Sequence, residues 1–450
     1  MKFIQKISNP FVVFVERFYP NPFVFAIILT LITFLLSIII TPTNFTDAIE
    51  YWGSGLPKLL SFMAQLALTL ITAHTVAHTD LAQKFLSKLA RVPKSVFQSY
   101  FLVALISGAA SLIAWSLGLV VGALMAKQVA IEADKRELKV HYPLLVASAY
   151  AGFVIWHMGY SSSSALFVAT PGHILEEQMG ILPVTETIFS TFNIVIAVIT
   201  LGVISIVCPL MHPEDSEIIH LPKEKFKSSE EEKAATKKIT TAGDKLDNSR
   251  VFTTLIGGLL LVFLVKWFYE KGLNLNLNIV NWTFLAAGLL LSRNVIHFVE
   301  LIKNGSKTVG EILLQYPFYA GIMGLMAGSG LVDLMSNWFV TIASADTLSF
   351  FAFLSAGIIN VFIPSGGGQW AIQGPVFIQA AKELNVDPSV IVMGIAYGDQ
   401  WTNMIQPFFT IPLLAIAGLD MRKIMGFTFI ILLVTLVCFG GGLLIMGAGH

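Results

Sequence analysis

The stretch SVFQSYFLVALISGAASLIAWSLGLVVGALMA, residues 95–126, contains no charged side chain over its whole length. At about 1.5 Å per residue, one helix of this length is longer than the roughly 30 Å core of a bilayer. Gly108, Ser116 and Gly118 interrupt the run near its centre. One interpretation is a long tilted helix with a kink, and the other is a re-entrant hairpin that returns to the side it entered.

Similar charge-free runs follow one another along the rest of the chain. Of the 450 residues, 55% are hydrophobic and 12% are charged, whereas about 25% of the residues of a soluble protein are charged. Apolar runs of about 20 residues without strict alternation are typical of membrane-spanning helices rather than of barrel strands. The sequence therefore predicts an all-α polytopic membrane protein in a lipid bilayer. The composition excludes intrinsic disorder, and the zero net charge argues against a nucleic-acid partner.

The positions of the basic residues favour the hairpin interpretation. If 95–126 and 347–381 are both hairpins, 24 of the 28 Lys and Arg residues fall on one face of the membrane, as the positive-inside rule requires of the cytoplasmic face. If 95–126 crossed the membrane once, the basic segments 80–96 and 127–142 would lie on opposite faces. The hairpin interpretation places the N-terminus in the cytoplasm and the C-terminus outside.

The second half of the chain repeats the order of the first. The motif AYAG at 149–152 matches AYGD at 396–399, at an offset of about 247 residues, and each motif lies in a run that reads as a broken helix. Because a single extra helix separates the two units, the second unit is expected to be inverted. Two inverted repeats, each with a re-entrant hairpin and a broken transmembrane helix, are typical of secondary transporters.

The expected boundaries follow from these runs. The first repeat, 1–211, contains spans at 23–42 and 58–79, a hairpin at 97–127, a broken helix at 143–170 and a span at 186–208. A cytoplasmic linker occupies 212–250. The last part, 251–450, contains a connecting helix at 251–269, spans at 279–299 and 308–332, a hairpin at 347–382, a broken helix at 388–418 and a span at 424–447.

The tip of the second hairpin reads PSGGGQW, residues 364–370. Three glycines allow a close backbone approach, and the arm that follows begins with the positive end of a helix dipole, which attracts anions. The alternative is a tight turn without a ligand. The candidate substrate-binding residues at this tip are Ser365, Gly366, Gly367, Gly368, Gln369 and Trp370.

The second broken helix carries Asp399, the only Asp, Glu, Lys or Arg in the middle of a predicted membrane segment. A charged group at this depth indicates a functional site. Asp399 can ligate Na⁺, carry a proton or cap the second half of the helix, and Thr402 and Gln406 supply further oxygens for a coupling ion. Trp401 and Asn403 are candidate substrate contacts. No other metal or cofactor is expected, because the chain has no P-loop and its two cysteines lack metal-ligand spacing.

The first broken helix offers His157 and the serines Ser161, Ser162 and Ser163 as further substrate contacts. Serines in a membrane run face a polar cavity or bond back to their own helix. His157 can bind a carboxylate, relay protons or be a satisfied core histidine. Trp115 and Ser116 are expected at the tip of the first hairpin, and they are further candidate substrate-binding residues. Since no Lys or Arg lies at membrane depth, the site suits one carboxylate on a small apolar body.

Two motifs, PSGGGQWAIQGPVF at 364–377 and AYGDQWTNMIQPF at 396–408, resemble the bacterial short-chain fatty acid transporter family. The resemblance extends to 17–34, 115–130 and 315–322, and so covers nearly the whole chain outside the linker. The family pattern has Glu at the position of Asp399 and His at that of Gln369.

This resemblance implies uptake of acetoacetate, butyrate and similar acids across the bacterial inner membrane, with the C-terminus in the periplasm. It also implies a homodimer with a scaffold and a moving domain, coupled to Na⁺ or H⁺. We therefore expect a symporter for short-chain monocarboxylates and no enzyme activity. The alternatives are a dicarboxylate or amino-acid carrier of the same superfamily and an anion channel.

Overall fold

The computed structural model describes residues 22–171, 173, 175–221, 241–272, 277–307, 309–364 and 366–447. All regular elements within these ranges are helices. Seven of the helices are long and apolar enough to cross a membrane, or eight if one bent pair counts as a span. The expectation of an all-α polytopic membrane protein is therefore confirmed.

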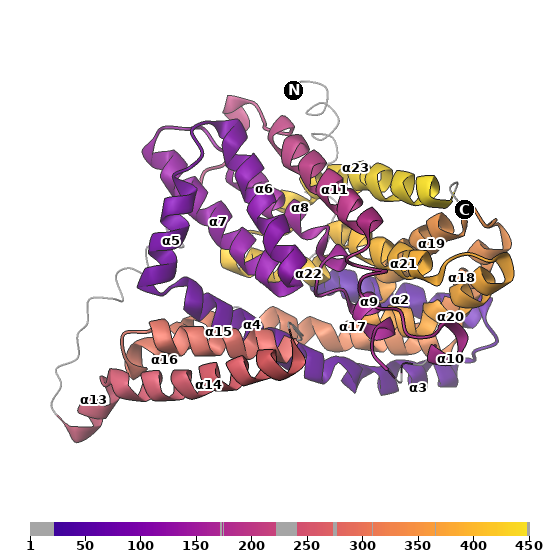
Figure 1. The fold of residues 1–450 in the computed structure, drawn as a ribbon, viewed down its shortest axis with the longest axis horizontal. Helices are drawn as coiled ribbons and strands as arrows, with labels where there is room; N and C mark the ends of the chain where they lie inside the picture. The colour runs from indigo at the N-terminus through magenta and orange to yellow at the C-terminus, as the bar shows by residue number, and fades with distance from the viewer. Residues whose placement is uncertain are drawn as a thin grey trace.

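The helices form two groups that pack side by side (Figure 1). The first helix group combines α2 (Pro22–Ile40), α3 (Phe45–Gly55), α4 (Leu60–Ala77), α14 (Arg250–Lys271), α15 (Leu277–Leu291), α16 (Val295–Ser306) and α17 (Gly310–Gly328). Large apolar side chains on the outer faces of α2 and α14 are exposed, among them Leu31, Leu35 and Leu259. Such a surface is stable when lipid tails cover it.

The second helix group contains the remaining long helices. It combines α6 (Val96–Ile113), α7 (Trp115–Lys135), α8 (Tyr142–Phe153), η2 (Trp156–Met158), α9 (Ser163–Val168), α11 (Thr191–Leu210), α19 (Leu348–Phe362), α20 (Gly366–Leu384), α21 (Pro388–Thr402), η5 (Asn403–Ile405), α22 (Pro407–Ala417) and α23 (Arg422–Gly447). Smaller elements connect these helices: η1 (Leu56–Leu59), α5 (Asp80–Ala90), α10 (Glu176–Met179), η3 (Asp215–Glu217), α13 (Ala242–Asp247) and α18 (Leu331–Thr341).

The opening stretch 95–126 folds as two antiparallel helices, α6 and α7, separated by the extended residue Ala114. The two arms touch closely, because the hydroxyl of Ser107 donates to the carbonyl of Gly118 at 3.1 Å. A side chain at Gly118 would collide with Ser111. A single kinked helix is therefore wrong for this stretch, whereas the depth of the turn in the membrane remains a prediction.

The two halves share one close helix crossing. A Cβ atom on Gly152 would lie 2.6 Å from the backbone nitrogen of Gly108, and one on Gly398 would lie 2.8 Å from that of Gly357. Only glycine lets the broken helix approach the first hairpin arm this closely. The same contact recurs in both halves, which supports an internal repeat. The inverted orientation of the repeats remains a prediction.

Three expected spans differ in extent from the observed helices. The second span begins near Phe45 rather than at 58, because α3 and η1 lead into α4. The segment of α3 contains two acidic residues, Asp47 and Glu50, so the charge-free run, and with it the expected span, begins only after them. The span expected at 308–332 bends by 62° between α17 and α18. The span expected at 279–299 is divided between α15 and α16, where Asn294 caps α16.

Candidate functional site

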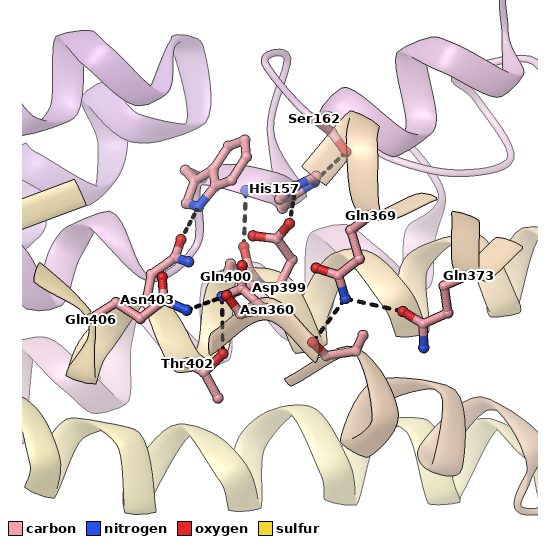
Figure 2. A network of polar contacts seen from close by, with 12 residues as sticks. His157, Ser162, Asn360, Gln369, Gln373, Asp399, Gln400, Thr402, Asn403 and Gln406 are labelled. Carbon is pink, nitrogen blue, oxygen red and sulfur yellow. Dashed lines mark hydrogen bonds and ion pairs between the residues drawn. The ribbon is translucent and has the colours of Figure 1, made fainter. Parts of the chain in front are cut away.

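The site lies where four segments of the second helix group meet. They are the start of α20, the turn around η2, the middle of α21 and the break that η5 makes after it (Figure 2). Each break has a local cause. Pro407 has no N–H, and Gln406 before it is extended, so α21 ends at Thr402 and α22 starts anew.

His157 and Asp399 form the centre of this site. The Nε2 atom of His157 lies 3.7 Å from Oδ2 of Asp399, and the two side chains are 0% and 1% exposed. Neither carboxylate oxygen of Asp399 accepts a hydrogen bond from any described residue, and Nε2 of His157 has no such partner either. Burying a charged group without a partner is costly. This pair therefore needs a further charge, a proton or a ligand to be satisfied.

The start of α20 packs directly onto this pair. A Cβ atom on Gly366 would lie 2.2 Å from Nε2 of His157 and 3.1 Å from Oδ2 of Asp399. Gly366 therefore permits the N-terminal end of α20, with its positive dipole end, to reach both side chains. Gly367 is next to Ser163, whose Cβ would be 3.7 Å from an added Cβ. Gly368 follows in the first turn of α20, and Ser365 lies outside the described residues.

Two hydrogen bonds hold His157 in place, one at its ring and one at its backbone. Its Nδ1 lies 3.0 Å from the hydroxyl of Ser162, and its backbone N–H donates to Oε1 of Gln400 at 2.9 Å. Ser162 thus orients the ring through the nitrogen that does not face Asp399, and which nitrogen carries the proton decides the direction of that bond.

Asn403, at the break of the second broken helix, joins the two halves of the chain. Its side-chain oxygen accepts from the indole of Trp156 at 2.9 Å, and its carbonyl accepts from the hydroxyl of Tyr150 at 2.7 Å. A matching bond runs the other way, from the hydroxyl of Tyr397 to Asn193. Asn403 therefore holds the two broken helices together, and its Nδ2 still lacks a partner among the described residues.

A second network fixes α19 against the break. Asn360 donates to the carbonyl of Asp399 at 2.7 Å and to the hydroxyl of Thr402 at 2.9 Å. Thr402 donates in turn to the carbonyl of Gly357, and the amide of Gln406 donates to the carbonyl of Asn360. The hydroxyl of Thr402 is thus already occupied. Gln406 keeps one unpartnered acceptor, Oε1.

Gln369 ties the two arms of the second hairpin together. Its amide donates to the carbonyl of Ala356 at 2.8 Å and to Oε1 of Gln373 at 3.0 Å. Gln373 continues the chain of bonds to Ser355. One acceptor atom, Oε1 of Gln369, has no partner among the described residues. The contacts observed for Gln369 are therefore structural, with one oxygen left for a ligand.

The first hairpin tip docks on the first broken helix, beside the central pair rather than in it. The backbone N–H of Trp115 donates to the hydroxyl of Ser161 at 2.9 Å, and the ring of Trp115 packs edge-on against Phe409. Ser116 is buried, and its hydroxyl has no partner in the described part of the chain. Ser161 therefore connects the hairpin tip to the turn that carries His157.

Two of the three tryptophans expected as substrate contacts, Trp370 and Trp401, lie in packed regions. Trp370 is fully buried in an apolar cluster, with Leu175 and Phe377, and its indole N–H is unpartnered among the described residues. Trp401 donates to the carbonyl of Leu432 at 2.8 Å and packs on Phe353. Trp401 thus packs between α19 and α23, and the observed contacts give it no role in the polar site.

Several site residues were not singled out from the sequence. They are Asn360, Gln400, Gln373, Trp156, Tyr150 and Asn193. Asn360 and Asn193 are amides inside charge-free apolar runs, and a buried amide must find partners. That rule, applied to every polar residue in the apolar runs, identifies both positions.

Comparison with known proteins adds the identity of the chain. The sequence profile of the family described as "Short chain fatty acid transporter" matches residues 3–446. A protein of Escherichia coli (strain K12) named as a short-chain fatty acid transporter is 39% identical over 444 residues, which cover 99% of each chain. A protein of Haemophilus influenzae (strain ATCC 51907 / DSM 11121 / KW20 / Rd) with the same name is 36% identical over 447 residues, covering 98% of this chain and 99% of that one.

Two solved structures are distantly similar. The YdaH transporter of Alcanivorax borkumensis has a TM-score of 0.47 at 15% identity, and the alignment covers 95% of this chain and 98% of that one. The MtrF efflux pump of Neisseria gonorrhoeae has a TM-score of 0.39 at 16% identity, with 97% of each chain covered. Neither likeness is close enough to carry an argument about function. The family profile and the full-length relatives show that this chain is a membrane transporter, not an enzyme, and that it belongs to the short-chain fatty acid transporter family.

Proposed function

We propose that this chain is a secondary active transporter that moves short-chain monocarboxylates, such as acetoacetate and butyrate, together with a cation. The observation that carries this proposal is the meeting of His157, Asp399 and the start of α20 in one buried place. Such a place combines an anion-attracting helix end with a carboxylate that needs a cation or a proton.

The substrate carboxylate would bind at the first turn of α20, where backbone N–H groups and the helix dipole favour an anion. Oε1 of Gln369 only accepts hydrogen bonds, so it does not bind the carboxylate, which is left to the backbone N–H groups beside it. None of the described residues of the polar network is Lys or Arg. One carboxylate therefore fits this site better than two, which favours a monocarboxylate over a dicarboxylate.

Alternating access would occur by movement of the second helix group against the first. All side chains of the central site belong to the second helix group, while the first helix group contributes none of them. A site that lies entirely within one helix group can be exposed to either side of the membrane when that group moves. As the family resemblance implies, we propose that the first group is the scaffold and forms the interface of a homodimer.

The proposed placement is the bacterial inner membrane, with the N-terminus cytoplasmic and the C-terminus periplasmic. Support comes from the basic segments on either side of α6 and α7, both of which lie on one face if these helices return to the side they entered. Single cysteines introduced by Lys88→Cys and Lys135→Cys should both react with a membrane-impermeant thiol reagent from the cytoplasmic side only. Labelling from opposite sides would contradict the topology.

Counterflow in proteoliposomes tests the transport proposal. Vesicles that contain the purified chain are loaded with unlabelled butyrate or acetoacetate and diluted into the labelled acid. A carrier concentrates label transiently, whereas a channel only equilibrates it. Succinate and neutral amino acids, loaded in parallel, test the alternative substrates. If no short monocarboxylate exchanges while one of these does, the substrate assignment is wrong.

A further inference from the structure

We propose that the coupling cation is a proton, bound by the Asp399–His157 pair, and that one proton enters with each monocarboxylate so that transport is electroneutral. This inference rests on the proposed function. It replaces an unspecified cation with one chemical species and assigns the two side chains that bind it.

The first step is that two anions compete for one helix end. The carboxylate of Asp399 already lies against the start of α20, next to the position of Gly366. A substrate carboxylate drawn to the same helix end would approach a second negative charge in a dry, buried environment. Two carboxylates that share such a site cannot both remain ionised, and one of them takes up a proton. Binding of the substrate anion therefore requires that Asp399 be neutralised.

The second step concerns which cation can neutralise it. Na⁺ requires several oxygen ligands around it. The described neighbours of the Asp399 carboxylate are an imidazole nitrogen and the N–H end of α20, and neither supplies an oxygen ligand. The nearby hydroxyl of Thr402 donates to a carbonyl and accepts from Asn360.

A proton has simpler requirements, and this pair meets them. When Asp399 is protonated, its O–H can donate to Nε2 of His157, which is unpartnered among the described residues and lies 3.7 Å from Oδ2. A small side-chain adjustment shortens this distance to that of a hydrogen bond. Ser162 contacts Nδ1 of the ring, and Gln400 accepts from the backbone N–H of His157. Both bonds keep Nε2 directed toward Asp399.

The charge balance follows from these states. The empty carrier has an ionised Asp399 and a neutral His157, so the pair carries one negative charge. The loaded carrier has one added proton on the pair and one substrate anion, so the site again carries one negative charge. Because the empty and loaded forms carry the same charge and cross in opposite directions, a complete uptake cycle moves no net charge across the membrane. The membrane potential then has no effect on the final gradient of the acid.

Other titratable groups near the pair are already engaged or distant. Tyr150 and Tyr397, on α8 and α21, donate to Asn403 and Asn193. The remaining titratable residues on the packed helices lie toward their ends or on other faces: Tyr100 on α6, Lys127, Glu132, Asp134 and Lys135 on α7, Tyr142 on α8, Cys208 on α11, Lys382 and Glu383 on α20, and Arg422, Lys423 and Cys438 on α23. No charged group faces the pair from α9 or α19.

The test uses the full chain in proteoliposomes with labelled acetoacetate, and protein-free liposomes are measured alongside to subtract passive diffusion of the acid. A pH-sensitive dye trapped inside records proton entry. We expect acidification in proportion to acetoacetate uptake, at one proton per anion. Replacing Na⁺ by choline should leave uptake unchanged, and a potassium gradient with valinomycin should leave the final level of uptake unchanged. Uptake that requires Na⁺, or a final level that follows the imposed potential, would overturn the proposal.

Two variants of Asp399 separate a proton site from a structural role. Wild-type counterflow should fall as the pH rises and the pair loses its proton. Asp399→Asn keeps a neutral side chain at every pH, so its counterflow should lose this pH dependence and its proton uptake should disappear. Asp399→Glu restores a carboxyl group and should restore both signals.

The outcomes distinguish this inference from the proposed function. If the wild type shows no acetoacetate counterflow, the proposed function fails. If counterflow occurs without proton entry, or if Asp399→Asn keeps the wild-type pH profile, the proposed function stands and the proton assignment is wrong.

Discussion

The contact between Gly366 and His157 makes a strong prediction about a single methyl group. In Gly366→Ala, the new Cβ would lie 2.2 Å from Nε2 and 2.7 Å from Cε1 of His157, whereas ordinary contacts are 3.4–4 Å. The ring cannot easily retreat, because Ser162 contacts its Nδ1 and Gln400 fixes the backbone N–H of the same residue. One partner must therefore move by more than an ångström. Overpacking of this kind costs about 1–3 kcal/mol.

The assay is thermal unfolding of the purified protein in detergent, followed by tryptophan fluorescence. Gly366→Ala should lower the midpoint by roughly 2–10 °C, since about 1 kcal/mol corresponds to about 2–4 °C for chains of a few hundred residues. Gly367→Ala is the matched control, because its Cβ would meet only Ser163 at 3.7 Å. The control midpoint should be unchanged or slightly higher, since alanine favours helix over glycine by about 1 kcal/mol.

A double variant identifies the partner in the collision. In a His157→Ala background the methyl group has room, so the additional Gly366→Ala change should cost little. If Gly366→Ala and Gly367→Ala had equal midpoints, or if the penalty persisted without the imidazole, the packing of α20 on His157 would be refuted.

Three further predictions follow from the fold. Gly398→Ala should lower the free energy of unfolding by more than about 3 kcal/mol, because its Cβ would meet backbone atoms of α19 that cannot turn away. The control is Gly202→Ala, whose Cβ has nothing within 4 Å and which should stay within about 0.5 kcal/mol of the wild type. Denaturation in detergent measures both values. Trp156→Phe removes the indole donor that joins the two broken helices, and should cost about 1–3 kcal/mol in the same assay because a buried acceptor loses its partner. Burial lowers the pKa of His141 from 6.5 to about 4, so the neutral imidazole stabilises the fold fully above about pH 6.5, and this stabilisation is lost as the pH falls toward about 4. The protection factor of the Ile219 amide, which donates to Nδ1 of His141, should therefore fall as the pH falls over that range, and the protection factor in a His141→Phe variant should show no such change.

Much of the architecture could be predicted from the sequence because the membrane constrains it strongly. The scarcity of charge gave the all-helical fold, and Gly108 with Gly118 indicated the turn that the structure places at Ala114. The observed breaks after Gly152 and before Pro407 also agree with the expected broken helices. The sequence did not reveal α3, since Asp47 and Glu50 made that segment resemble a loop.

The site was predicted in its components but not in its connections. Asp399 and His157 were each candidates, yet 242 positions separate them in the sequence, and no local pattern indicates that they touch. Their proximity depends on how the two halves cross, which is a property of tertiary packing. The same reason explains Trp401, which is adjacent to polar residues in the sequence but turns toward α23 in the structure.

The hydrogen bonds that join the two broken helices also determine which parts of the protein can move relative to each other. Tyr150, Trp156 and Tyr397 each reach across to the other half of the chain, so the two halves of the binding region cannot separate without breaking buried hydrogen bonds. Contacts between the first and second helix groups are sparser, and they include those where α4 meets α7 and where α17 meets α19 and α22. The substrate would then move together with the second helix group, which would behave as one rigid body. Residues at the contacts between the two helix groups lie far from the bound substrate carboxylate. They would determine how far and how fast the second helix group moves.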